Sequence, residues 1–356
     1  MSTRPSPARP SPARTAGRRP TMLAGGLAAA LFSGLVAGCS ASATGNEDAV
    51  NEDGSVDLSQ VTLIVGDQRG GSKALLTAAG LLDDAEYDVE FKEFTSGPPL
   101  LEALGAGSVH VGGVGNTPPL FAAAAGRDFE VVQAATYGGR GDAIVVPEDS
   151  DVDEVADLDG ATIAVAEGSS ANYHLVAQLE AAGIDYDDVE IKNLQPPDAL
   201  GAFEGGYVDA WAIWEPYTSQ AEQDAGARVI ADGGTLANGY NFQAASTEAI
   251  EDEATAAALE DYVARIAEAQ VWAQTHEQEW ADAWSAETGL APEITLAAVK
   301  NRDVEVVPID DALIASEQEM ADTFDAAGLI PEQVDVAPYF SDRYDDTSLA
   351  AAEGAR

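Results

Sequence analysis

The chain has 356 residues, of which 46% are hydrophobic and 22% charged, so it can bury a large core and is long enough for about two domains. Its 62 acidic residues against 17 basic ones give a formal net charge of −45, which argues against nucleic-acid binding. Its single cysteine, Cys39, cannot form a disulfide within the chain, so the fold must rely on its core.

Residues 1–38 have the composition of an export signal. They hold five arginines and no acidic residue, and an apolar stretch over 22–37 leads to small residues directly before Cys39. This arrangement resembles a bacterial lipobox, in which cleavage precedes the cysteine and the thiol is lipidated; the alternative is an ordinary cleavage site. Arg18 and Arg19 leave both the general and the twin-arginine export routes open. Because no second stretch is long enough to cross a bilayer, we expect the mature chain to be anchored to the outer face of the cell membrane by lipidated Cys39.

Residues 39–58 are small, polar and acidic, which predicts a flexible tether. Short strands then alternate with helices as far as about residue 240, a pattern typical of a parallel sheet with helices on both faces. Predicted strands lie at 61–65, 89–94, 109–114, 130–136 and 143–146 and, in a second unit that begins near residue 147, at 161–166, 189–193, 208–213 and 228–231. Longer helices follow at 255–284, 292–301 and 314–327, and residues 341–356 are expected to fray.

Four strand-to-helix junctions share one pattern, at 66–72, 96–98, 117–118 and 167–173. A helix beginning at each would present free N–H groups and the positive end of its dipole, which attract anions. Taken alone, Ser96, Thr117 and Ser169 can each be no more than a helix cap. Strand ends on one side of a parallel sheet converge, however, so the four junctions together predict a pocket for a tetrahedral, singly charged anion such as a sulfonate. Arg69 or Arg140 can add a cation.

Two residues after the buried strand at 208–213 are further candidates. Trp214 can offer an apolar wall to an alkyl chain, whereas Trp211, within the strand, is expected in the core. Glu215 can bind an amine or hydroxyl group of a ligand, bridge the two units, or be an ordinary surface acid.

Catalysis has little support in the sequence. The three histidines, His110, His174 and His276, form no metal-ligand pattern. We expect His110 in core packing, His174 at the surface and His276 on a polar helical face. The chain has no Gly-x-Ser-x-Gly elbow and no Walker loop. We therefore expect no enzyme activity, no catalytic residue, no metal and no cofactor.

Seven segments, in this order, resemble the substrate-binding proteins of ABC importers for aliphatic sulfonates, in a wider group that also serves taurine and nitrate. They are IVGDQRGG (64–71), EFTSGPPLLEALGAGSV (93–109), GNTPPLFAAAAG (115–126), EGSSANYHLV (167–176), LQPPDALGAFEGGYVDAWAIWEPY (194–217), RVIADG (228–233) and PIDDALIASEQEMADTFDAAGLIP (308–331). The resemblance implies a type II periplasmic-binding-protein fold, in which two doubly wound α/β lobes are joined by a hinge and hold the ligand in the cleft between them. Lobe 1 would comprise 60–145 and 242–340, lobe 2 would comprise 146–241, and 341–356 would form a tail.

The same motifs imply which residues bind the ligand. These are Gln68, Arg69, Ser96, Gly97, Asn116, Thr117, Ser169, Ser170, Asn172, Trp214 and Glu215, and Arg140 in a glycine-rich loop is a further candidate. Asn116 stands where the family often has an acidic residue. A neutral amide repels an anion less and removes a partner for a ligand's amine, which disfavours taurine-like zwitterions.

The resemblance implies a monomeric receptor that captures an aliphatic sulfonate by hinge closure and delivers it to an ABC permease, which works with a separate ATPase subunit. One alternative keeps this receptor fold but binds taurine, nitrate or a pyrimidine precursor. Another is an enzyme with a similar two-lobe fold.

Overall fold

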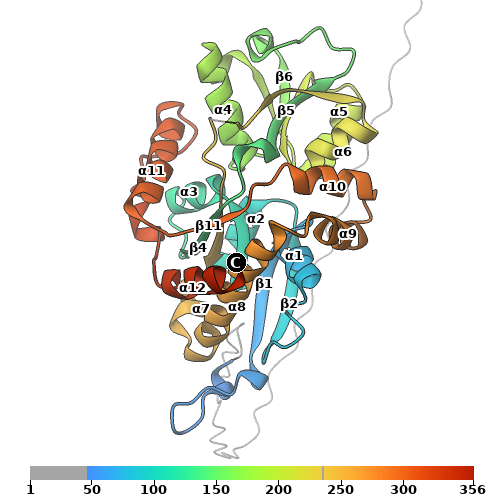
Figure 1. Cartoon of the computed structure of the whole chain (residues 1–356). Helices are drawn as coiled ribbons and strands as arrows, with labels where there is room; N and C mark the ends of the chain where they lie inside the picture. Colours follow the sequence, from blue (N-terminus) through green and yellow to red (C-terminus); the bar gives the residue numbers. More distant parts are fainter. Residues whose placement is uncertain (1–45, 235) are drawn as a thin grey trace, which may run out of the picture. The chain divides into compact units, whose positions relative to one another are not determined.

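The computed structural model describes residues 46–234 and 236–356, and its strands form two sheets (Figure 1). The first sheet has the strand order β11-β4-β10-β3-β1-β2. Its strands are β1 (Thr62–Gln68), β2 (Asp88–Phe94), β3 (Val111–Gly115), β4 (Glu130–Thr136), β10 (Tyr240–Ala245) and β11 (Glu305–Val307). β1 is parallel to β2 and β3, whereas β10 is antiparallel to both β3 and β4.

The second sheet has the order β7-β6-β8-β5-β9 and is built from one continuous part of the chain. Its strands are β5 (Asp142–Pro147), β6 (Thr162–Val165), β7 (Glu190–Asn193), β8 (Ala210–Trp214) and β9 (Ala227–Asp232). β6 is parallel to β7 and β8, and β5 is antiparallel to β8 and β9. Both sheets are therefore mixed, because β5 and β10, which follow the two links between the sheets, run against their neighbours. The expected lobe boundary at 145/146 cuts through β5, which lies wholly in the second sheet.

Helices cover both sheets, and together with the sheets they form the two lobes of the expected α/β fold. They are α1 (Ser72–Ala79), α2 (Gly97–Gly105), α3 (Thr117–Ala124), α4 (Ser170–Ala182), α5 (Pro196–Glu204), α6 (Tyr217–Asp224), α7 (Thr247–Glu251), α8 (Glu253–Ala273), α9 (Glu277–Thr288), α10 (Pro292–Lys300), α11 (Asp311–Ala326) and α12 (Asp345–Ala355). Helices α1 to α4 begin at the four predicted junctions. None of the described helices is both long enough and apolar enough to cross a lipid bilayer.

The first sheet is packed on both faces. Val131 and Val132 are neighbours in β4 yet enter different hydrophobic clusters, because successive side chains of a strand point to opposite faces. One cluster includes side chains of α1, α8 and α9, and the other includes side chains of α2, α3 and α11. In the second lobe Trp211 is fully buried, as expected, and contributes about 1.5–3 kcal/mol in the way that large buried apolar side chains do.

The expected helix over 255–284 is two helices, α8 and α9, with a turn between them. In this turn the His276 ring stacks on Trp272, with 4.5 Å between the ring centroids, and its Nδ1 lies 2.8 Å from the Trp272 carbonyl oxygen. His110 is buried, as predicted, and its Nδ1 accepts the Ile64 N–H. The prediction for His174 was wrong, because this side chain is fully buried, and burial lowers its pKa to about 4.

Two segments that were expected to be mobile are packed instead. Within the predicted tether, Asn46 is buried: its Nδ2 donates to Thr255 Oγ1 at 2.9 Å, and its Oδ1 accepts the Thr62 N–H at 3.0 Å. The tether prediction is therefore wrong for residues 46–58, and Cys39 lies outside the described residues. At the other end, α12 packs on α8, with Ala352 buried and Thr347 donating to Glu260 at 2.9 Å. Leu349, Ala351 and Ala352 pack against α8, so this segment does not fray.

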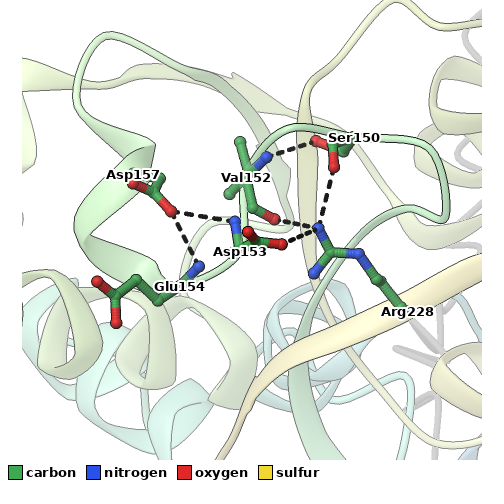
Figure 2. A network of polar contacts seen from close by, with 6 residues as sticks. All are labelled: Ser150, Val152, Asp153, Glu154, Asp157 and Arg228. Carbon is green, nitrogen blue, oxygen red and sulfur yellow. Dashed lines mark hydrogen bonds and ion pairs between the residues drawn. The ribbon is translucent and has the colours of Figure 1, made fainter.

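The loop that follows β5 is fixed by one arginine of β9. Arg228 Nη2 donates to the carbonyl oxygens of Ser150, at 3.1 Å, and Val152, and it pairs with Asp153 at 3.1 Å (Figure 2). Asp157 accepts from the backbone N–H groups of Asp153 and Glu154 and so holds the next turn (Figure 2). The Asp153 side chain is 88% exposed, so the two carbonyl bonds carry most of the stabilisation.

We therefore expect Arg228→Ala to lower the free energy of unfolding by about 1–2 kcal/mol, because it leaves two partly enclosed carbonyl groups without their donor. The matched variant Asp153→Ala should cost less than about 0.5 kcal/mol, since it removes only an exposed ion pair. Urea denaturation of both variants measures the difference. Equal losses would show that the ion pair, rather than the carbonyl bonds, holds the loop.

Candidate ligand-binding site

A cavity lies where strands of both sheets end. It is lined by the β1–α1 turn, the end of β3, the start of α4, the end of β8 and the segments that link the two sheets. Seven of the twelve predicted ligand-binding residues line it: Gln68, Arg69, Gly97, Ser169, Ser170, Trp214 and Glu215. The convergence of parallel strand ends thus brings distant junctions together.

The β1–α1 turn forms one wall and is held by its own hydrogen bonds. Asp67, which the sequence analysis did not single out, accepts the N–H groups of Ser72, at 2.8 Å, and Lys73, at 3.0 Å, and so caps α1. Burial nevertheless raises the pKa of Asp67 to about 7. Gln68 donates to the Gly113 carbonyl at 2.9 Å. Arg69 reaches across to the other lobe, where it donates to Gln220 Oε1 at 3.2 Å and lies over the Tyr217 ring.

The start of α4 forms the opposite wall. Ser169 caps this helix, because its hydroxyl accepts the Asn172 N–H at 3.3 Å and donates to the Ala166 carbonyl at 2.6 Å. The Ser170 hydroxyl is engaged by Asp142 at 2.8 Å. Among the described residues, no acceptor faces the backbone N–H groups of Ser170 and Ala171. This helix end therefore presents free donors and a positive dipole to the cavity.

Arg302, just after α10, is the cation that the sequence analysis missed. Its guanidinium lies over three aromatic rings, 4.6 Å from the ring centre of Trp284, 5.2 Å from that of Tyr137 and 5.7 Å from that of Trp280. Within the described part of the chain its side chain makes no hydrogen bond and no ion pair, although it lines the cavity. Burial lowers its pKa below the usual value, but an arginine stays protonated in proteins. The aromatic faces stabilise the charge and leave its N–H donors available to a ligand.

Only a weak sequence signal could have indicated Arg302. Beyond residue 38 the chain has 12 basic residues against 62 acidic ones, so each arginine deserves a test as an anion partner. The rings that hold it come from two separate places in the chain, Tyr137 after β4 and Trp280 with Trp284 in α9, and no local pattern links either place to Arg302.

Asp142, the first residue of β5, brings a carboxylate to the cavity beside this cation. Its Oδ1 accepts the Ser170 hydroxyl, while its Oδ2 has no partner among the described residues. Burial raises the pKa of Asp142 to about 7; the nearby Arg302 charge lowers this pKa and the Glu215 charge raises it. Asp142 was not among the predicted site residues because the predicted strand began one residue later, at 143.

Trp214 and Glu215 both line the cavity, at the end of β8. Glu215 is buried and is not a surface acid: it accepts from Ser219 Oγ at 2.8 Å, Ser219 N at 3.1 Å and Asn301 Nδ2 at 2.6 Å. Burial raises the pKa of Glu215, and these three donors oppose that rise. Since Asn301 follows α10 of the first lobe, the bridging role is the alternative that the geometry supports.

Five predicted residues do not line the cavity, because other groups occupy their side chains or they face solvent. Ser96 donates to Gln195 Oε1 at 2.7 Å, and Asn172 binds the Gly168 N–H and the Tyr186 hydroxyl. Arg140 is exposed. Neither Ser96 nor Thr117 caps its helix, in contrast to Ser169.

Asn116 and Thr117 belong to a buried network on the first lobe. Thr117 Oγ1 donates to Asn116 Oδ1 at 2.9 Å, and Asn116 Nδ2 donates to Asn238 Oδ1 at 2.7 Å. Asn238 in turn donates to Glu317 Oε1 at 2.8 Å. Asn116 therefore joins α3 to α11 through Asn238, and its amide identity carries no information about the charge of the ligand.

Glu317 gives this network a pH dependence. The side chain is fully buried, and burial raises its pKa to about 8. The folded state therefore keeps a proton that the unfolded state has lost, and stability falls between about pH 4.5 and pH 8, by roughly 1 kcal/mol per pH unit. Glu317→Gln cannot ionise, so its free energy of unfolding should fall less steeply over this range.

Urea denaturation of wild type and variant at several pH values between 5 and 9 checks this expectation. Glu319→Gln is the matched control, because it removes the same charge from an exposed position on the same helix. If the stabilities of wild type and Glu317→Gln run parallel from pH 5 to pH 9, Glu317 is not protonated in the folded state.

Comparison with known proteins adds independent information. The model of the NMT1-like family matches residues 73–285. The chain is 32% identical over 284 residues to a putative aliphatic sulfonates-binding protein of Escherichia coli (strain K12), which spans 79% of this chain and 88% of the relative. The structure of the alkanesulfonate-binding protein SsuA from Xanthomonas axonopodis pv. citri bound to MOPS is similar with a TM-score of 0.73 and 33% identity, over 79% of this chain and 98% of that one.

An enzyme shares the fold at greater distance. The desulfurization enzyme DSZB has a TM-score of 0.58 and 20% identity, over 81% of this chain and 99% of that one. At this identity the similarity concerns the fold alone.

Proposed function

The chain belongs to the NMT1-like family and to the aliphatic sulfonate-binding proteins of ABC importers, and from this membership we propose that it is an extracytoplasmic receptor that captures a small sulfonate. The observation that carries the ligand class is Arg302. A cation with unused N–H donors, held between aromatic rings on a cavity wall, is suited to an anion with several oxygen acceptors. The free N–H groups at the start of α4 supply further donors from the other lobe.

Trp214 favours a sulfonate with an organic part over a bare inorganic ion. It lines the same cavity and offers an aromatic face to an alkyl chain. Sulfonate oxygens at Arg302 and carbon atoms at Trp214 would together occupy the polar and the apolar parts of the cavity.

Capture would proceed by closure of the two lobes. Arg302 belongs to the first lobe and α4 to the second. A ligand that contacts both binds the closed form more tightly than the open form and so stabilises the closed form. The two linking segments touch at Gly139 and Gly233, where a Cβ on Gly233 would lie 2.1 Å from the Gly139 carbonyl oxygen. This contact suits a compact hinge. The closed form would be recognised by an ABC permease, with ATP hydrolysis by a separate subunit.

The proposed receptor binds its ligand and releases it chemically unchanged. None of the three histidines lines the cavity, and the one cysteine of the sequence, Cys39, lies outside the described residues. A ligand recovered unchanged after prolonged incubation with the protein supports a receptor. Release of sulfite or any other product would favour an enzyme like the desulfurization relative.

The proposed location is the outer face of the cell membrane, with lipidated Cys39 as the anchor. The basic, apolar and small-residue segments that precede Cys39 support this assignment. Labelled fatty acid should enter the wild-type protein during expression in a bacterial host and should be absent from Cys39→Ala. Equal labelling of both proteins would place the lipid elsewhere.

Calorimetry on the purified protein tests the ligand class. The panel comprises short alkanesulfonates, taurine, nitrate, sulfate and a thiamine-pyrimidine precursor, each at low and at high salt, because the acidic surface repels anions at long range. Saturable binding of sulfonates with weak binding of sulfate and nitrate supports the proposal. No sulfonate heat at either salt concentration would overturn it and leave the fold to serve another ligand.

A further inference from the structure

The cavity is lined by an acidic and a basic side chain that still have polar atoms without a hydrogen-bond partner among the described residues. Building on the proposed function, we infer that the preferred ligand is an aminoalkanesulfonate, whose sulfonate binds Arg302 while its ammonium group binds the free Oδ2 of Asp142. The two side chains line the same cavity from different lobes. Asp142 thereby becomes the residue that determines specificity among sulfonates.

Two arginines line the cavity, and Arg302 is the one whose N–H donors are all unused among the described residues. Arg69 also lines the cavity, but it is already engaged by Gln220 and by the Tyr217 ring. Arg302 has aromatic neighbours and no acceptor among the described residues. The sulfonate therefore belongs at Arg302.

The cationic half has one acid with a spare oxygen. Asp67 accepts two backbone N–H groups at the start of α1, and Glu215 accepts from Ser219 and Asn301, so both carboxylates are occupied. Asp142 has only the Ser170 hydroxyl on Oδ1, which fixes its orientation and leaves Oδ2 open. A carboxylate held in this way offers a charge-assisted hydrogen bond to an ammonium group.

The charge balance of the cavity points the same way. Glu215 and Arg302 are the charged groups that face Asp142, and they act on its pKa in opposite directions. A simple alkanesulfonate would bring another negative charge next to two carboxylates, whereas an aminoalkanesulfonate brings one charge of each sign. The neutral amide of Asn116 does not count against a zwitterion, because Asn116 does not line the cavity.

A matched pair of ligands tests the inference. Taurine and 1-propanesulfonate have the same number of heavy atoms and differ by an ammonium group in place of a methyl group. Calorimetry on the purified full-length protein at pH 8 should show taurine binding at least about tenfold more tightly, as expected for one charge-assisted hydrogen bond in a cavity. Tighter binding of 1-propanesulfonate would overturn the inference while leaving the sulfonate receptor intact, and absence of binding by both ligands would overturn both proposals.

The variant Asp142→Asn keeps an oxygen for Ser170 and removes the charge. It should lower the ratio of taurine to 1-propanesulfonate affinity by at least about tenfold. Asp153→Asn is the matched control, since it removes an equal charge from an exposed loop of the same lobe and should leave the ratio unchanged. An unchanged ratio in Asp142→Asn would assign the ammonium site elsewhere.

A measurement on the wild type guards against misfolding of the variant. Burial raises the pKa of Asp142 to about 7, and its ionised form binds an ammonium group much more strongly than its neutral form does. The preference for taurine should therefore fall by about tenfold between pH 8 and pH 6. A preference that is constant over this range would contradict the role of Asp142.

Discussion

Replacing Arg302 by glutamine should weaken sulfonate binding by about a hundredfold, because it removes a charge-assisted set of hydrogen bonds from a cavity wall. Arg302→Lys keeps the charge but loses the planar group that lies over three rings, so it should fall between wild type and Arg302→Gln. Calorimetry with a short alkanesulfonate measures all three proteins.

The control for this prediction is Arg140→Gln. Arg140 is the cation that the glycine-rich loop suggested, but it is exposed and does not line the cavity. Its replacement should change the affinity by less than about threefold, as is usual for an exposed charge. A larger loss in Arg140→Gln than in Arg302→Gln would reassign the anion site to the loop.

Of all the single methyl groups that could be added to the β1–α1 turn, the one in Gly70→Ala should destabilise the protein most. Gly70 has a φ of +70°, and a Cβ there would lie 0.9 Å from Nε1 of Trp284, a fully buried ring. Either the ring moves or the turn does, at a cost of about 3 kcal/mol or more. Because Trp284 lies under the Arg302 guanidinium, the variant should also lose sulfonate affinity.

Gly54→Ala separates the clash from the backbone strain. Gly54 has a φ of +82° but no atom within 4 Å of the added carbon, so it should cost only about 1 kcal/mol. Urea denaturation followed by tryptophan fluorescence compares the two variants. If Gly70→Ala were as stable as Gly54→Ala, the contact between Gly70 and Trp284 would not exist in solution.

The sequence predicted the elements whose signals are local. A strand, a glycine-rich or proline-containing turn and an apolar helix follow one another at each of the four junctions, and α1 to α4 begin there. Helix α12 escaped prediction because residues 341–356 are polar when read alone, and only the facing surface of α8 makes its alanines a packing face.

The cavity was predictable in part for the same reason. Gln68 and Trp214 are the last residues of their strands, Ser170 begins the helix after β6, and strand ends meet in this fold. Ser96 and Asn172 also lie at strand-to-helix junctions, yet other side chains occupy them. Ser96 binds Gln195, which is 99 residues away in the chain, and Asn172 binds Tyr186, which is 14 residues away. Which hydroxyl or amide remains free depends on contacts that no local motif records, and this is also why Arg302 and Asp142 were missed.

The connectivity of the two sheets has a consequence for the order in which the chain can fold. All five strands of the second sheet are complete at Asp232, so that lobe needs nothing that follows it in the chain. The first sheet cannot join β3 to β4 until β10 has been made and inserted between them. During synthesis or refolding, the inserted lobe can therefore form while its host is still open. Arg302 comes later still, so the ability to hold an anion is among the last properties that the chain acquires.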